Sequence, residues 1–288
     1  MPSGDVAFDL NGYRFGMVDG SQLRVRDWTV DGLKYDSVPV EHSRRQFGKD
    51  QITPPIHRIE LRTKAPTEAV AREIVREFAK RWRADHLGPG EIMHLGFRVN
   101  GKWSRIPGRP GDLYLPTTNY LATTGRLDIV AEWRASTPTS MDETASSVTV
   151  PHSETSSGGM VFPQAPPFQW GHTSTPHVRR AFIAGDSPTP VTIRINGPVT
   201  RPWVQIGNMR LELTGTLQWD EQITLDGLAK TVMYTRGRSG SAVSLVNPHF
   251  KLADLTLNPG QYDVTYSGVD STGTSSTTVE WRNASRSL

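Results

Sequence analysis

RINGPVTRPWVQIGNMRLELTGTLQWDEQITLDGLAKTV, residues 194–232, consists of short runs in which apolar and polar side chains alternate. The alternating apolar residues, beginning just before this stretch, are Val191, Ile193 and Ile195, then Val204 and Ile206, Leu211 and Leu213, Leu217 and Trp219, and Ile223 and Leu225. Because successive side chains of a β-strand point to opposite faces, each run predicts a strand with one buried face. Many short strands without a convincing helix predict an antiparallel β-sandwich or jelly roll.

The same stretch holds a compact acidic group, which raises the question of catalysis. Asp220 and Glu221 follow Trp219, and Asp226 comes shortly after them. A glycosidase needs two carboxylates roughly 5–10 Å apart, one of them with a raised pKa. Neighbouring residues on a strand face opposite sides, so we expect Asp220 and Glu221 at the polar end of a hairpin, and Asp226-Gly227 in the next tight turn. We therefore assign no catalytic residue, and a sugar platform of exposed aromatic side chains remains an alternative.

The rest of the second half has the same β character. QYDVTYSGVDSTGTSSTTVEWRN, residues 261–283, predicts a hairpin in which Tyr262, Val264 and Tyr266 are opposite Val279 and Trp281. From Ser136 the composition becomes rich in Ser, Thr, Pro and Gly. We therefore expect a first domain at residues 1–137 and a second at 138–288, with 138–160 resembling a linker.

The first half predicts strands of one sheet, interrupted by a single helix. Alternation indicates strands in residues 22–30, with a bulge or bend, and in 58–63, 92–100 and 125–135. Between them, residues 67–87 have the helical period, with Thr67 as N-cap and Gly88-Pro89-Gly90 as terminator. Its apolar stripe comprises Val70, Ile74, Phe78 and Trp82. We expect this stripe to pack on the sheet, with the charged side solvated.

Composition excludes several classes of protein. The chain has 288 residues, 36% of them hydrophobic and 21% charged, which is typical of a globular protein of about two domains. It has no cysteine, so disulfides, thiolate metal sites and cysteine nucleophiles are excluded. No apolar run is long enough to span a membrane and no secretory signal is visible, so we expect no membrane insertion and assembly in a cytoplasm.

The formal charge of +3 is distributed unevenly along the chain. Residues 1–137 contain 21 basic and 17 acidic side chains, whereas residues 138–288 contain 11 and 12. A basic half is compatible with a nucleic acid or an acidic partner, but this excess is also that of an ordinary mixed surface.

Three short motifs resemble chemical signatures and are better explained by structure. GFRVNGKWS, residues 96–104, approaches a phosphate loop, but Trp103 stands where that motif needs Ser or Thr, and Asn100-Gly101 is typical of a tight hairpin. His172 and His177, with His152 upstream, lack metal-ligand spacing, and no carboxylate or cysteine is close to the first two. GRSGS, residues 237–241, lacks the second glycine of a nucleophile elbow. We expect no cofactor and no metal.

Four stretches, in their order, resemble the distal tail proteins of long-tailed phages, the type often called minor tail protein in phages of actinobacteria. They are GGMVFPQAPPFQW (158–170), AGDSPTPVTIRINGPVTRPWVQI (184–206), LTGTLQWDEQITLDGLAKTV (213–232) and LNPGQYDVTYSG with TTVEWRNA (257–284). The resemblance is specific from residue 158 onward. In the first half it is looser and rests on a sheet with one helix, which ends in LDIVAEWRAS.

This resemblance implies a structural virion protein and no enzyme. The first domain is expected to have a tail-tube-type β fold with one helix and to form a homo-hexameric ring at the tail tip. The second is expected to be a galectin-like β-sandwich. The implied partners are sister copies, the tail tube protein and the tail hub protein, with the tape measure protein and receptor-binding proteins as further candidates.

Two alternatives stay open alongside this reading. One is a carbohydrate-binding or adhesion module of the virion that holds a surface glycan, and the other is a polysaccharide-degrading enzyme.

Residues 31–57 and 105–120 are polar, rich in Pro and Gly, and too long for tight turns. We expect these segments to become ordered on ring assembly, as arms between subunits or onto the tube.

Overall fold

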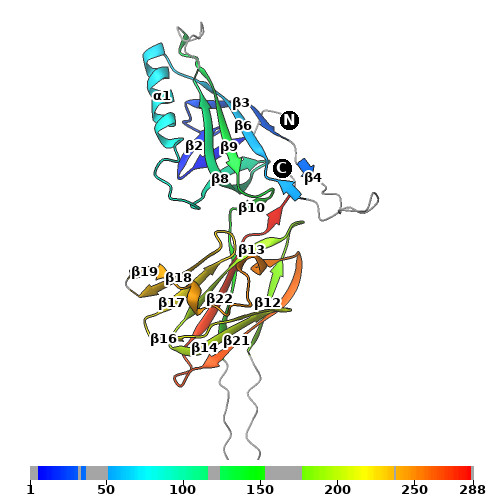
Figure 1. Cartoon of the computed structure of the whole chain (residues 1–288). Coiled ribbons are helices and arrows are strands. Elements are labelled where there is room, and N and C mark those ends of the chain that lie inside the picture. The colour runs from blue at the N-terminus through cyan, green and yellow to red at the C-terminus, as the bar shows by residue number, and fades with distance from the viewer. Residues whose placement is uncertain are drawn as a thin grey trace, which may run out of the picture. The chain divides into compact units, whose positions relative to one another are not determined.

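The structure is a computed structural model that describes residues 6–31, 34–36, 51–115, 124–152, 177–236 and 238–286, with backbone alone at 34–36, 51–52 and 238. The described chain is mainly β, and α1 (Glu68–Arg81) is its one α-helix. The chain divides into two compact units, Met1–Glu143 with Ala284–Leu288, and Thr144–Asn283. Both chain ends therefore belong to the first unit, as Figure 1 marks, and the second unit is an insertion.

The first unit is built on one antiparallel sheet with the strand order β2-β1-β7-β8-β9-β6-β3. These strands are β2 (Tyr13–Gly16), β1 (Ala7–Leu10), β7 (Met93–Val99), β8 (Lys102–Tyr114), β9 (Asp128–Ala135), β6 (Ile56–Thr63) and β3 (Leu23–Val30). β10 (Ser140–Asp142) pairs with β8 and with β23 (Ala284–Ser285). This pairing is why the first unit extends beyond residue 137, where the sequence places the boundary, and why it includes the C-terminal residues.

Local features predicted from the sequence set the register of this sheet. Asn100 and Gly101 both have positive φ angles, 51° and 79°, and they join β7 to β8 as a two-residue hairpin turn. β3 carries the expected bulge, where its pairing with β6 shifts between Val25 and Asp27. Residues 96–104 therefore form the end of β7, the hairpin turn and the start of β8, and not a phosphate-binding loop.

The strand β8 corrects the expectation of a long loop at residues 105–120. Arg105–Tyr114 belong to β8, which pairs with β7 on one side and with β9 on the other. Pro110 is accommodated where the pairing with β9 shifts between Pro110 and Leu113, whereas Pro107 lies opposite His94 in the regular ladder with β7. The other expected arm comprises residues 31–57. Its last two residues, Ile56 and His57, begin strand β6. Within it, β4 (Lys34–Asp36) and β5 (Gln51–Thr53) form a separate two-stranded ladder. Residues 37–50 and 116–123 lie outside the described part of the chain.

Helix α1 packs one face against the first unit's sheet (Figure 1). The hydroxyl of Thr67 accepts from the amide of Val70, which confirms the expected N-cap. The helix ends at Arg81 and not at residue 87, because Trp82 leaves the helical conformation and its buried indole packs against Trp133. Most of the predicted stripe is buried, but Val70 is exposed.

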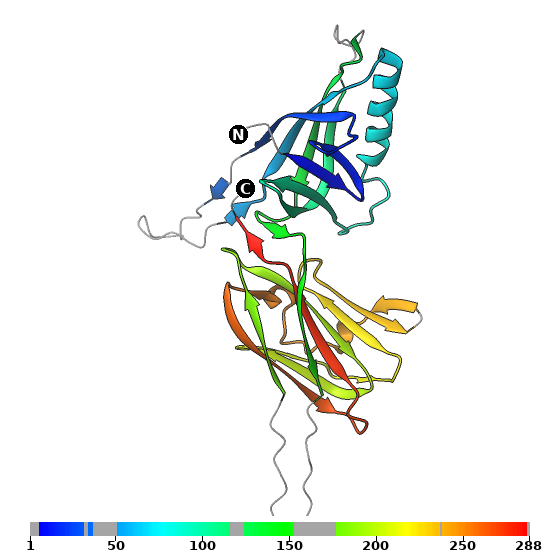
Figure 2. The same ribbon diagram turned by 180° about the vertical axis from the view of Figure 1, so that it is seen from behind.

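The second unit is a sandwich of two antiparallel sheets, which confirms the predicted β-sandwich class. One sheet has the order β11 (Ser146–Pro151), β22 (Ser276–Trp281), β13 (Thr189–Asn196), β17 (Gln222–Asp226), β18 (Thr231–Arg236) and β19 (Arg238–Ser241), with β20 (Thr256–Leu257) on β13. The other has the order β12 (Val178–Ile183), β21 (Gly260–Val269), β14 (Val199–Ile206) and β15 (Met209–Glu212), with β16 (Thr216–Leu217) on β14. Figure 2 shows β22 beside β11.

The hairpin predicted for residues 261–283 is wrong. β21 pairs with β12 and β14, whereas β22 pairs with β11 and β13, so the two strands lie in opposite sheets. Their apolar residues do share one core, where Tyr266 and Trp281 are both buried. The connection between them crosses from one layer to the other, and alternation alone could not distinguish this from a hairpin.

Residues 138–152 also differ from the linker expected at 138–160. They contain β10 and β11, and Val150 of β11 is part of the sandwich core. Residues 153–176, including the quoted stretch 158–170, lie outside the described residues.

Candidate interaction surfaces

The acidic group of residues 220–226 serves to hold turns. Glu221 is buried; its carboxylate accepts from the amide of Gln218 at 2.6 Å and from Arg236 at 3.2 Å. Asp220 is exposed and contacts the same guanidinium at 3.2 Å. The expected hairpin end is wrong, because β16 ends at Leu217 in one sheet and β17 begins at Gln222 in the other. Trp219, expected to alternate with Leu217, stands in the turn between them with 72% of its surface exposed.

Asp226 has a comparable role one strand later. Its carboxylate oxygen Oδ1 accepts from the amides of Leu228 and Ala229, at 2.8 and 2.9 Å. This confirms the predicted turn at Asp226-Gly227, which joins β17 to β18. All three carboxylates thus have structural partners, and Glu221 is the only one of them that is buried.

The remaining sequence motifs are also explained by structure where they are described. Lys102 forms an ion pair with Asp142 at 2.8 Å. His152 is buried and packs its ring against Tyr266, His177 is exposed, and His172 lies outside the described residues. Arg238–Ser241 of GRSGS form strand β19. The described residues contain no group of three metal-ligating side chains and no helix long and apolar enough to cross a membrane.

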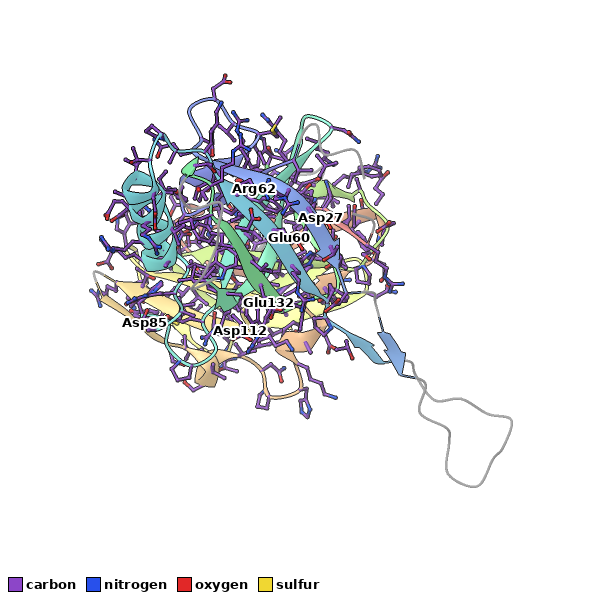
Figure 3. All side chains as sticks on the ribbon, turned by 90° about the horizontal axis from the view of Figure 1, so that it is seen from above. Asp27, Glu60, Arg62, Asp85, Asp112 and Glu132 are labelled. Carbon is purple, nitrogen blue, oxygen red and sulfur yellow. The ribbon has the colours of Figure 1, made fainter. Side chains whose placement is uncertain are left out.

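The outer face of the first unit's sheet is covered by charged side chains in cross-strand pairs. Figure 3 shows Asp27 of β3, Glu60 and Arg62 of β6, and Glu132 of β9 along neighbouring strands. Arg58 contacts Glu132 at 2.7 Å, and Arg62 contacts Asp128 at 2.6 Å. The hydrogen bond from Arg62 holds the pKa of Asp128 below its usual range.

The opposite face of the same strands is buried and mostly apolar. His57, Ile59, Leu61 and Thr63 alternate with the charged residues of β6 and point into the core. Val130 and the exposed Tyr114, which are opposite each other in the β8–β9 ladder, are apolar positions on the outer, largely charged face. A sheet with one buried and one largely charged face can line a water-filled space or meet a polar partner. The outer face therefore suits a solvated or polar contact.

The sheet of the first unit has two edges. β2 and β3 stand at the ends of the strand order, and no ladder joins them in the described structure, although Gly16 and Val25 approach closely. β3 is eight residues long and pairs with β6 on one side only, and an edge of this length that lacks a partner is a template for pairing with another chain. The β4–β5 ladder comes directly after β3 in the chain and extends away from the sheet (Figure 3).

The fold of the chain is similar to that of chains from phage hub and baseplate structures. The Dit protein (gp 19.1) of phage SPP1, described as a paradigm of the hub adsorption apparatus in phages infecting Gram-positive bacteria, matches with a TM-score of 0.56 and 9% identity, over 97% of this chain and 98% of that one. A chain in the activated phage P2 baseplate with Ca matches with a TM-score of 0.55 and 9% identity, over 96% of both chains. A chain in the p2 baseplate with Sr matches with a TM-score of 0.55 and 10% identity, over 96% and 97%. No protein-family model and no curated protein sequence matches the chain.

Proposed function

We propose that this chain is a structural, non-enzymatic protein of the tail tip of a long-tailed phage, in the position of a distal tail protein. The observation that carries the proposal is the extent of the structural likeness, which includes both units in their order and nearly the full length of each neighbour. An isolated sandwich is a common architecture, but a sandwich inserted into another unit of one sheet and a packed helix is a more specific arrangement.

The proposal extends to assembly of the first unit into a homo-hexameric ring between the tail tube and the hub. Support comes from the unpaired edge of β3 and the adjacent β4–β5 ladder, which can contact a neighbouring copy in a head-to-tail arrangement. Closed rings arise from such heterologous contacts when the rotation between copies closes. Contacts with the tape measure protein and with receptor-binding proteins belong to the same proposal.

The structural role of the acidic group at residues 220–226 supports the proposal that the chain is not an enzyme. The carboxylates of Asp220, Glu221 and Asp226 hold turns and one arginine. A glycosidase pair requires two carboxylates on either side of an open sugar site. Glu221 is covered, so the pair cannot approach a glycosidic bond without unfolding the turn.

Localisation in the virion tests this proposal. Gold-labelled antibodies against the full-length protein should decorate phage particles at the end of the tail distal to the head. Label distributed along the tube or on the head, or an absence of the protein from purified particles, would contradict it.

A further inference from the structure

The second unit has an open surface pocket of about 590 Å³ beside the β14–β15 hairpin. Its volume is within the range of small-ligand sites, about 300–1,000 Å³. One wall is formed by Arg210 and Glu212 of β15, and the other by Asn247, His249, Phe250 and Asp254, which lie after β19. Arg210 and Glu212 lie within residues 194–232, but the sequence patterns assign no chemical role to any lining residue.

Arg210 is held in place by two contacts. Its guanidinium stacks on the ring of Trp203, 4.5 Å from the centroid, and its Nε donates to Glu212 at 2.7 Å. Trp203 is directly opposite Glu212 in the β14–β15 ladder, so the three side chains share one face. No other contact of the Arg210 side chain is found among the described residues, so its terminal N–H groups remain available as donors.

The opposite wall is fixed by backbone hydrogen bonds. The amide of Asn247 donates to the carbonyl of Glu212 at 3.1 Å, which ties the two walls together. The side-chain oxygen of Asn247 accepts from the amide of His249, and the carbonyl of Asn247 accepts from the amide of Phe250. Phe250 and Met209 pack against the sandwich core and supply an apolar part of the lining. The backbone around Asn247 is thus tied to β15, and the two together border an open pocket.

We propose that this pocket binds a neutral oligosaccharide. Adjacent sugar hydroxyls both donate and accept hydrogen bonds, and the lining offers a guanidinium, carboxylates, an amide and an imidazole at short range. The carbon face of a sugar ring requires an apolar contact, which Phe250 and Met209 provide. Glu212 compensates the charge of Arg210, and Asp254 adds a further negative charge, so the site opposes phosphates, sulfates and uronates.

Oligosaccharide binding by the full-length protein tests this proposal. The protein is applied to an array of neutral and uronate-containing oligosaccharides, and the affinity for the best ligand is measured by titration calorimetry. We expect binding to a subset of the neutral probes. Arg210→Gln and His249→Ala should each weaken it about tenfold or more, because each removes a hydrogen-bonding group from the site.

Arg180→Gln is the matched control, because Arg180 is an exposed arginine of β12 that contacts Asp263 at 3.5 Å outside the pocket lining. This variant should bind as the unmodified protein does, and thermal unfolding of all variants verifies that they are folded. Absence of binding to every neutral probe, binding to uronates alone, or affinity unchanged in both pocket variants would overturn the proposal. These outcomes leave the proposed place of the chain in the tail untouched, since that is tested by antibody labelling.

Discussion

Glu221 and Asp220 are adjacent carboxylates that contact the same guanidinium, but they differ in burial. The side chain of Glu221 is 6% exposed and that of Asp220 is 58% exposed. A buried carboxylate that loses a partner leaves donors unsatisfied, whereas an exposed ion pair is screened by water and salt. Substituting each carboxylate in turn therefore distinguishes a structural role, in which only the buried Glu221 matters for stability, from a catalytic role, in which both carboxylates are needed.

Glu221→Gln should lower the free energy of unfolding of the second unit by about 1–3 kcal/mol, since the hydrogen bonds of Gln218 and Arg236 lose a charged acceptor. Asp220→Asn should leave it nearly unchanged. Chemical denaturation of the full chain measures both. The structural role would be contradicted if both variants lost the same amount of unfolding free energy. It would also be contradicted if the unmodified protein degraded a polysaccharide and both substitutions abolished that activity.

His57 is a buried histidine in the core of the first unit, beside Trp28. Burial lowers its pKa from 6.5 to about 4. Above pH 6.5 the group is neutral in both the folded and the unfolded state and contributes no pH dependence. As the pH falls from 6.5 toward 4, the unfolded chain binds a proton that the folded unit does not, so stability decreases.

This shift predicts an acid-dependent loss of roughly 3 kcal/mol from the first unit between pH 6.5 and 4. His57→Leu should remove most of that pH dependence, whatever its effect on stability at neutral pH. His86→Gln is the control, because the imidazole of His86 is exposed. Unfolding followed as a function of pH measures the slopes; equal slopes in His57→Leu and the unmodified chain would show that burial of His57 is not the cause.

At the scale of elements, the β17–β18 turn is constrained by a close approach of backbone. A Cβ atom at Gly227 would stand 2.3 Å from the carbonyl oxygen of Leu255 and 2.8 Å from that of Val191. Gly227→Ala should therefore destabilise the second unit by about 2–3 kcal/mol. Gly240 of β19 has nothing within 4 Å of that position, so Gly240→Ala should change stability by less than about 0.5 kcal/mol. Thermal unfolding of the two variants makes the comparison, and similar midpoints would contradict it.

Sequence patterns predicted individual elements better than their partners. The period of two located β3, β7 and β9, and Asn100-Gly101 located a turn, because these signals depend on residues close together in the chain. The predicted pairing of β21 with β22 was wrong, since alternation specifies a buried face but not the sheet to which a strand belongs. β8 was hidden by Pro107, Gly108 and Pro110, of which only Pro110 lies at the shift in pairing with β9.

The candidate oligosaccharide site could not be predicted from sequence for a related reason. Arg210 and Asn247 are distant in the chain, and only the ladder between β14 and β15 and the hydrogen bond from Asn247 to Glu212 bring the two walls together. Each residue type taken alone is ordinary on a protein surface.

At the scale of the whole molecule, the chain leaves the first unit after β10 and returns to it at β23. Each unit has a separate hydrophobic core, one inside the inserted sandwich and one between the sheet and helix of the first unit. The first unit can then provide contacts for a ring while the second carries a separate binding surface. The fold thus accommodates two roles without either depending on the other.

The assembly state of the purified full-length protein tests the central claim most directly. Negative-stain images combined with mass measurement in solution should show a six-fold ring with a central hole, held together by copies of the first unit. A protein that stays a monomer at high concentration, with no ring in any image, would contradict the proposed tail-tip role.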